Sequence, residues 1–172
     1  MVQLRDKEGD DERLLESATR LRELCSAAGA LFWVNDRPDL AVAAGADGVH
    51  VGQEDLPVAE ARTAVGADGL VGVSTHSPTQ LSSALASEAD QISVGPVWAT
   101  PTKEGRPAAG LDYVREAAAT AGDRPWFAIG GIDAGNLAEV LEAGARRVVV
   151  VRAIRESADP EAAARALRER LG

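Results

Sequence analysis

Hydrophobic and polar positions along the chain alternate in blocks of two kinds. Short runs rich in Val, Ile and Leu predict strands, and the longer Ala-rich stretches between them predict helices. The predicted strands lie near residues 2–5, 31–34, 48–51, 69–73, 90–94, 126–129 and 147–151. Because these runs are too uniformly apolar for strands with one exposed face, they indicate a parallel sheet that is covered on both faces.

The clearest predicted helix starts after Asp10. Leu14, Ala18, Leu21 and Cys25 fall on one stripe of a 3.6-residue period, which is the buried face of a helix. Further helices are predicted near 37–43, 57–64, 78–86, 110–121, 134–143 and 160–170. The sequence Ala-Gly-Ala occurs at 28–30, 44–46 and 143–145, each time where a helix ends and a strand follows. This repetition indicates βα units wound one after another.

The element pattern predicts one α/β domain over residues 1–172, a (β/α)8 TIM-type barrel that is N-terminally truncated to about seven βα units. A closed barrel needs eight strands, so a doubly wound open sheet is an alternative on strand count alone. The chain opens directly with a strand and no preceding helix, as expected for a barrel without its first βα unit.

Composition narrows the functional classes. The net charge of −9 argues against a general nucleic-acid or anionic-membrane surface. Cys25 is the one cysteine, so no intrachain disulfide can form and a reducing, cytoplasmic location is the simplest expectation. The first residues lack the apolar segment of a signal peptide, and no apolar run approaches the about 18 residues of a membrane span. A homo-oligomer is compatible with the sequence.

Unusual polar and glycine-rich clusters follow nearly every predicted strand. In α/β folds the carboxyl ends of parallel strands carry the ligand site, so these loops are expected to converge on one mouth. Arg5, Lys7 and Lys103 are cations suited to phosphate oxygens. Asp36 and Asp55 are carboxylates in neighbouring loops, without a Cys or His cluster, which suggests a hard cation such as Mg²⁺.

A second phosphate site is suggested by Gly130 and Gly131, which precede a helix in the second-to-last unit. Each residue also has a purely structural interpretation. Asp36 alone could cap the following helix, and the two glycines alone could form a turn. His50 and His76 show no metal-like spacing and are interpreted as hydrogen-bonded structural residues, and Trp98 is the tryptophan most expected to face the mouth.

At this point the motifs resemble those of the thiamine-phosphate synthase family, in its order and with its spacing, up to about residue 154. The matching segments are 3–7 (QLRDK), 35–37 (NDR), 48–55 (GVHVGQED), 72–76 (GVSTH), 95–97 (GPV) with 100–103 (TPTK), and 128–132 (AIGGI). The Thr-x-Thr-Lys loop together with Asn-Asp and Gly-Gln-Glu-Asp is the most specific part of this resemblance.

The resemblance implies a role for each site residue. The pyrimidine diphosphate is held by Gln3, Leu4, Arg5, Asp6, Lys7 and Asn35, with further contacts from Ser74 and Lys103. Asp36 and Asp55 ligate Mg²⁺. The thiazole phosphate site is lined by Thr100, Pro101, Thr102, Gly131, Val151 and Arg152. The residues implied to act in catalysis are Arg5, Lys7, Ser74 and Lys103.

The implied reaction displaces diphosphate from the methylene carbon of the pyrimidine by the thiazole nitrogen, through a dissociated, carbocation-like pyrimidine. No side-chain nucleophile is then needed, which agrees with the absence of a Ser–His–Asp or Cys–His pattern. The loop 96–108 could close as a lid. Two features depart from the family: its usual first strand and helix are absent here, and Arg152 stands where many relatives have Ser.

Two other interpretations stay open on the sequence. A related barrel that isomerises a thiazole or sugar phosphate needs one phosphate site, and the apparent pyrimidine-diphosphate residues argue against it. An inactive truncated paralogue would expose the edges of its first and last strands. The coding DNA just upstream separates a misplaced start from a genuine fragment, and the undecayed motifs favour a misplaced start.

Overall fold

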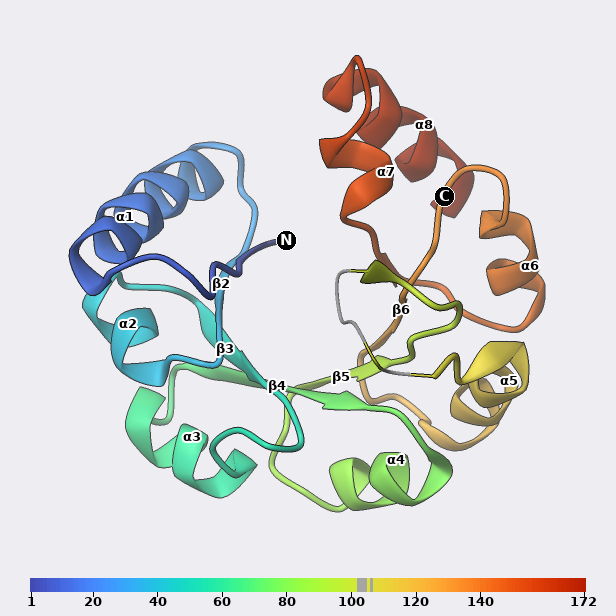
Figure 1. Cartoon of the computed structure of the whole chain (residues 1–172). Coiled ribbons are helices and arrows are strands. Elements are labelled where there is room, and N and C mark those ends of the chain that lie inside the picture. Colours follow the sequence, from blue (N-terminus) through green and yellow to red (C-terminus); the bar gives the residue numbers. More distant parts are fainter. Residues whose placement is uncertain (102–104, 106) are drawn as a thin grey trace. The chain divides into compact units, whose positions relative to one another are not determined.

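The computed structural model describes residues 1–101, 105 and 107–172, and within them the chain forms seven strands and eight helices (Figure 1). The strands are β1 (Val2–Leu4), β2 (Phe32–Asn35), β3 (Gly48–Val51), β4 (Leu70–Thr75), β5 (Gln91–Val94), β6 (Trp126–Ile129) and β7 (Val148–Val149). The helices are α1 (Asp11–Ala27), α2 (Pro38–Ala43), α3 (Val58–Val65), α4 (Pro78–Leu85), α5 (Gly110–Thr120), α6 (Leu137–Glu142), α7 (Arg152–Arg155) and α8 (Pro160–Leu171).

The chain divides into two compact units. The N-terminal unit comprises residues 1–74 and 86–90, and the C-terminal unit comprises residues 75–85 and 91–172. In the N-terminal unit, β1, β2, β3 and β4 pair in parallel and in chain order. In the C-terminal unit, β5, β6 and β7 do the same.

This order confirms the predicted α/β class with seven parallel strands. Because consecutive strands are neighbours within each unit, the winding is that of a singly wound sheet, and the reversed strand order of a doubly wound fold is not found there. In the described residues, β1 has a strand neighbour on one side only, and so has β7. The sheet therefore has open edges at these two strands.

Helices cover one face of the N-terminal strands, where α1 and α2 contact β2 and α3 contacts β3 (Figure 1). Side chains alternate between the faces of a strand. Phe32 and Val34 therefore share one face with Val49 and Val51, and all four are at most 1% exposed. The opposite face is not uniformly apolar, contrary to the sequence-based expectation: its register brings Asn35 beside His50.

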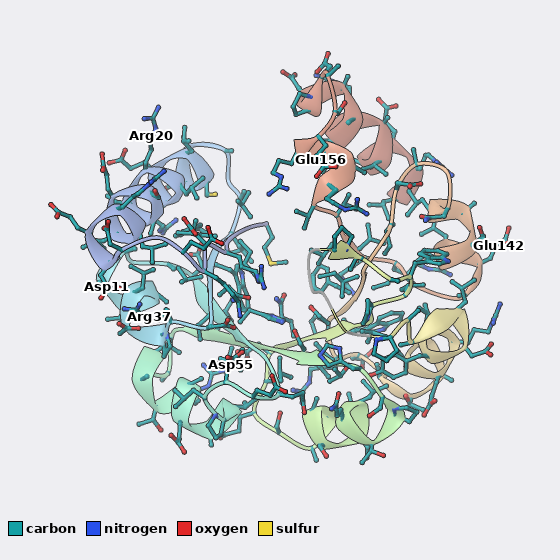
Figure 2. The ribbon with its side chains drawn as sticks, viewed as in Figure 1. Asp11, Arg20, Arg37, Asp55, Glu142 and Glu156 are labelled. Carbon is teal, nitrogen blue, oxygen red and sulfur yellow. The ribbon has the colours of Figure 1, made fainter. Side chains whose placement is uncertain are left out.

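Helix α1 follows the predicted stripe. The Asp10 side chain caps it by accepting the backbone N–H of Arg13 at 2.9 Å, and Leu14, Ala18 and Cys25 are buried. Its outer surface pairs with α2, where Asp11 accepts a 2.8 Å hydrogen bond from Arg37 (Figure 2). Arg37 also pairs with Asp39, and the guanidinium lowers the pKa of the Asp39 carboxyl.

Glycines end the helices as the Ala-Gly-Ala pattern predicts. Gly29, Gly45 and Gly144 have φ values of 61°, 62° and 103°, a backbone region that other residues rarely adopt. The alanine after each glycine donates its N–H back to a helix carbonyl, for example Ala46 to Ala41 at 2.8 Å. This is the hydrogen-bond pattern of a Schellman C-cap, and it turns the chain into the next strand.

Two strands of the N-terminal unit are each anchored at their amino end by an aspartate carboxylate. Asp47 accepts the backbone N–H of Phe32 at 2.7 Å and lies 3.7 Å from the guanidinium of Arg22 in α1. Asp90 makes the same kind of contacts. It accepts the backbone N–H of Val71 at 2.7 Å and forms an ion pair with Arg62 of α3. Each Asp therefore satisfies a buried strand N–H and ties the strand to a helix.

Two elements of the C-terminal unit differ from their predicted bounds. Strand β7 covers only Val148–Val149 of the predicted range 147–151, and it ends where its partner β6 ends at Ile129. The short helix α7 begins soon after, with Val151 as its N-cap. Helix α6 begins at Leu137 instead of near residue 134, because Asp133 accepts the N–H groups of Gly135 and Asn136 and holds these residues in a loop.

Candidate functional site

Strand register gathers polar side chains on one face of the N-terminal unit. Gln3 lies opposite Trp33, and Asn35 lies opposite His50, which lies opposite Gly72. Ser74 follows Gly72 by two residues and therefore points to the same face. The face away from the helices thus carries the polar residues of several strands near their carboxyl ends.

Asp36 follows directly after β2 and has an unusual backbone. Its φ is 62°, the left-handed region, and it is the non-glycine residue that adopts a positive φ within the described chain. Its N–H donates to the carbonyl of His50 at 2.8 Å, and the N–H of Arg37 donates to Asn35. The N-cap residue of α2 is Arg37, so the interpretation of Asp36 as a helix cap is wrong. Asp tolerates this region better than most residues because its side chain is short and polar.

A carboxylate pair and a lysine form a charged cluster in the loops that follow β1, β2 and β3. Burial is the main cause that raises the pKa of Asp36 above its ordinary value of 3.8, and the hydrogen bond and negative charge of Asp55 raise it further. Lys7 lies 3.5 Å from Oδ2 of Asp36 and lowers this pKa, with less effect. Two carboxylates this close compete for a proton or require a cation. A divalent cation held by one or two carboxylates and by substrate phosphates is typical of Mg²⁺, so the residues fit that ion.

The loop after β3 places the second carboxylate, and Figure 2 labels Asp55 there. Oδ2 of Asp55 accepts the backbone N–H of Gly52 at 2.8 Å. The Cβ of any other residue at position 52 would lie 2.7 Å from that oxygen. Gly52 therefore allows the carboxylate to fold back over its own loop.

Ser74 is held by two side chains from β3 and its following loop. Nε2 of His50 lies 2.9 Å from Oγ of Ser74, and both residues are 4% exposed. Nε2 of Gln53 donates to the Ser74 carbonyl at 2.6 Å. The prediction that His50 is a hydrogen-bonded residue is confirmed by its contact with Ser74. The described residues contain no group of three or more His, Cys, Asp or Glu that could hold a metal.

The predicted site residues from Gln3 to Lys7 differ from one another in their surroundings. Gln3 and Leu4 belong to β1, and Arg5 follows it as an exposed side chain. Asp6 accepts the N–H groups of Glu8 and Gly9 at 3.0 and 3.2 Å, so its carboxylate shapes the turn before α1. Lys7 lies beside the carboxylate pair and forms an ion pair with Asp36.

In the C-terminal unit, the double glycine after β6 packs closely on the chain after β5. Gly130 accepts the N–H of Trp98 at 3.1 Å, and a Cβ there would lie 2.4 Å from Cβ of Pro96. Gly131 has a φ of 67°, and its Cβ would lie 2.8 Å from Cβ of Trp98. The Gly131 carbonyl accepts the side-chain N–H of Asn136 at 2.8 Å. The glycines are thus required by backbone packing, whatever else they bind.

The other predicted residues of this unit are partly described. Thr100 is half-buried and Pro101 is exposed, while Thr102 and Lys103 lie outside the described residues. Val151 is 39% exposed and is the N-cap of α7, and the half-buried Arg152 is the first residue of that helix. All residues predicted for the pyrimidine diphosphate and the metal, apart from Lys103, fall in the N-terminal unit. All those predicted for the thiazole phosphate fall in the C-terminal unit.

Sequence reasoning assigned no site role to Gly52 and none in binding to His50. The sequence does carry a signal for His50, because it is a polar residue in the middle of an apolar strand. The signal for Gly52 was not available, since its need arises from the folded position of Asp55.

A parallel α/β fold with a carboxylate pair, a lysine and a buried His–Ser pair near the ends of its strands defines an enzyme with a polar site at the strand carboxyl ends. The family model for thiamine monophosphate synthase matches residues 1–154. The chain therefore belongs to the thiamine monophosphate synthase family.

Similar proteins and a solved structure support this family assignment. The chain is 59% identical to the thiamine-phosphate synthase of Thermus thermophilus, over 99% of this chain and 82% of that protein. It is 56% identical to the thiamine-phosphate synthase of Acidothermus cellulolyticus, over 99% of this chain and 81% of the other. The structure of the thiamine phosphate pyrophosphorylase from Pyrococcus furiosus superimposes with a TM-score of 0.90 and 32% identity, covering 98% of this chain and 81% of that one. No helix among the described residues is long and apolar enough to cross a membrane.

Proposed function

We propose that the chain catalyses the condensation of 4-amino-2-methyl-5-hydroxymethylpyrimidine diphosphate with thiazole phosphate, giving thiamine phosphate and diphosphate. The observation that carries the proposal is the clustering of Lys7 and Asp55 around Asp36, in loops that follow strands whose polar face carries Asn35 and His50. The 59% identity to a protein named thiamine-phosphate synthase supports the choice of substrates.

The reaction breaks the bond between the pyrimidine methylene carbon and the diphosphate oxygen, and the bonding electrons leave with diphosphate. The thiazole nitrogen then supplies the electron pair of the new carbon–nitrogen bond. No covalent bond to the protein forms, so the side chains act by binding, orientation and charge. They stabilise the negative charge that gathers on the leaving diphosphate and exclude water from the cationic pyrimidine.

Each residue assigned to the pyrimidine diphosphate or to the metal has a task in this proposal. Asp36 and Asp55 hold Mg²⁺, which supplies positive charge to the diphosphate when it is bound. Lys7, next to Asp36, adds a second positive charge, and Arg5 and Lys103 contact the diphosphate oxygens. Gln3, Leu4, Asp6 and Asn35 bind the pyrimidine end, and Ser74 donates to the diphosphate.

The thiazole phosphate binds at the C-terminal unit in this proposal. Gly131 and the residues 100–102 supply backbone and hydroxyl groups, and Val151 and Arg152 complete the set. The packing of Gly131 on Trp98 supports this assignment, because it keeps the loop after β6 in one conformation. We also propose that the two units belong to one barrel-type domain in a cytoplasmic enzyme.

The proposal is tested by mixing the purified chain with both substrates and Mg²⁺ and measuring thiamine phosphate and diphosphate. Asp36→Asn and Lys103→Ala are each expected to lower turnover at least about tenfold through lost charge stabilisation. Asp36→Asn is preferred over Asp36→Ala because asparagine also tolerates a φ of 62°.

Asp112→Asn is the matched control, since this carboxylate is 97% exposed on α5 and its removal should leave turnover unchanged. Formation of an isomerised phosphate without diphosphate release would identify the isomerase-type alternative. An unchanged rate in both site variants would refute the assigned roles, and the absence of any product would favour an inactive paralogue.

A further inference from the structure

His50 and Ser74 form a buried polar pair on the proposed substrate face. Each residue is 4% exposed, and Nε2 of His50 lies 2.9 Å from Oγ of Ser74. Gln53 fixes the carbonyl of the same serine. Ser74 therefore has little freedom to move, and the direction of its hydroxyl proton is decided by its bond to His50.

The hydroxyl group of Ser74 has one proton and two lone pairs, so the bond to His50 can run in two directions. If Ser74 donates to an unprotonated Nε2, its remaining lone pairs face outward and repel a phosphate oxygen. If Nε2–H donates to Ser74, the serine proton is free to point elsewhere. Diphosphate oxygens accept hydrogen bonds and do not donate them, so the second direction alone lets Ser74 bind diphosphate.

We propose that His50 is a positioning residue whose imidazole carries a proton on Nε2 and donates this N–H to Oγ of Ser74. The bond turns the Ser74 hydroxyl proton toward the leaving diphosphate. This inference rests on the proposed function, in which Ser74 contacts the diphosphate. The backbone of His50 also contacts a proposed metal ligand, because the His50 carbonyl accepts the N–H of Asp36 at 2.8 Å. One residue of β3 thus aligns the serine hydroxyl and the main chain of Asp36.

A double-mutant cycle tests the coupling. His50→Leu keeps a buried side chain of comparable size but removes the hydrogen bond, and Ser74→Ala removes its partner. We expect His50→Leu to lower kcat/KM for the pyrimidine diphosphate at least about tenfold in the presence of Ser74, and less than about twofold in the Ser74→Ala background. Equal losses in both backgrounds would overturn the proposal, because they would mean that His50 does not act through Ser74.

His50→Gln is the conservative variant, since its amide can donate near the position of Nε2. We expect it to recover most of the activity that His50→Leu loses, at equal folded fraction by circular dichroism. If His50→Gln is as inactive as His50→Leu while folded, a hydrogen bond from this position is not what Ser74 needs, and the proposal is wrong.

The nitrogen-15 NMR spectrum of the wild-type chain tests the tautomer directly and needs no variant to fold. The sequence has two histidines, and the signals lost in His50→Gln identify those of His50. We expect Nε2 of His50 to carry a proton at pH 7. An unprotonated Nε2 would contradict the proposed donor.

Titration with inorganic diphosphate and Mg²⁺, followed by calorimetry, separates this inference from the proposed function. Weaker binding to His50→Leu, with no further loss in the double variant, supports the role of His50 even if no thiamine phosphate forms. Undiminished binding to His50→Leu overturns it even if the wild-type chain is an active synthase.

Discussion

The backbone N–H of Gly52 lies 2.8 Å from Oδ2 of Asp55, and the space where a side chain would start at position 52 is filled by that same oxygen. The second proposed metal ligand therefore depends on the absence of a side chain three residues before it. Gly52→Ala is expected to push the Asp55 carboxylate away from Asp36 and to lower turnover at subsaturating Mg²⁺ more than at saturating Mg²⁺.

Asp55→Ala supplies the control for this prediction, because it removes the oxygen that the new methyl group would meet. Gly52→Ala should cost no further activity in the Asp55→Ala background. Steady-state rates across a Mg²⁺ titration measure both effects, and a full additional loss in the double variant would show that Gly52 acts in another way.

The carboxylate pair predicts a particular dependence of stability on pH. Burial and the neighbouring Asp55 raise the pKa of Asp36 in the folded chain above 3.8, so the folded state binds its proton more tightly than the unfolded state. The associated stability is present at low pH and is lost as the pH rises from about 4 through the raised pKa.

Urea unfolding from pH 4 to pH 7 in the presence of a chelator measures this loss. Asp55→Asn should reduce the decline with pH, because it removes the negative charge beside Asp36 and keeps an acceptor for Gly52. Mg²⁺ should raise the midpoint of the wild-type chain and have little effect on the variant. If the free energy of unfolding declines equally with pH in the wild-type chain and in Asp55→Asn without metal, the electrostatic coupling between Asp36 and Asp55 is contradicted.

The anchors at the amino ends of the strands predict a stability effect without an activity effect. Asp47→Ala leaves the N–H of the fully buried Phe32 without its acceptor, and the expected cost is about 1–3 kcal/mol in the free energy of unfolding. Asp112→Ala, which removes an exposed partner of Arg115, should change the unfolding midpoint by no more than the measurement error. Chemical denaturation of both variants checks the contrast.

The double glycine predicts an effect confined to one substrate. Gly131→Ala places a Cβ 2.8 Å from Cβ of Trp98 at a φ of 67°, so the loop after β6 must move. KM for the thiazole phosphate should rise at least about fivefold, with KM for the pyrimidine diphosphate unchanged. Gly122→Ala introduces the same kind of residue at a φ of 56° with open space around it, and it should leave both constants unchanged.

Most elements could be predicted because their signals are local. The buried stripe of α1, the cap by Asp10 and the Ala-Gly-Ala helix ends depend on residues a few positions apart. The end of β7 could not be predicted in this way. The Val-rich run continues to Val151, but the pairing with β6 ends at Val149, and Val151 is already the N-cap of α7.

The candidate site was predictable in residue type and only partly in geometry. The positions after strands indicated Lys7, Asp36 and Asp55, and the structure brings these three together. Asn35 and Ser74 are among the residues that the sequence predicts for the site, but the assumption that every strand is apolar on both faces gives no reason to place them on one face with His50. Only the pairing register shows that Asn35 and His50 lie beside each other.

The Asp47 and Asp90 anchors sit at the amino ends of the strands, whereas the proposed chemistry lies at their carboxyl ends. Evolution or a protein engineer could therefore vary the loops that follow the strands while the scaffold keeps its attachment to α1 and α3. Libraries that retain these two aspartates and their arginines should yield a larger share of folded proteins than libraries that randomise them.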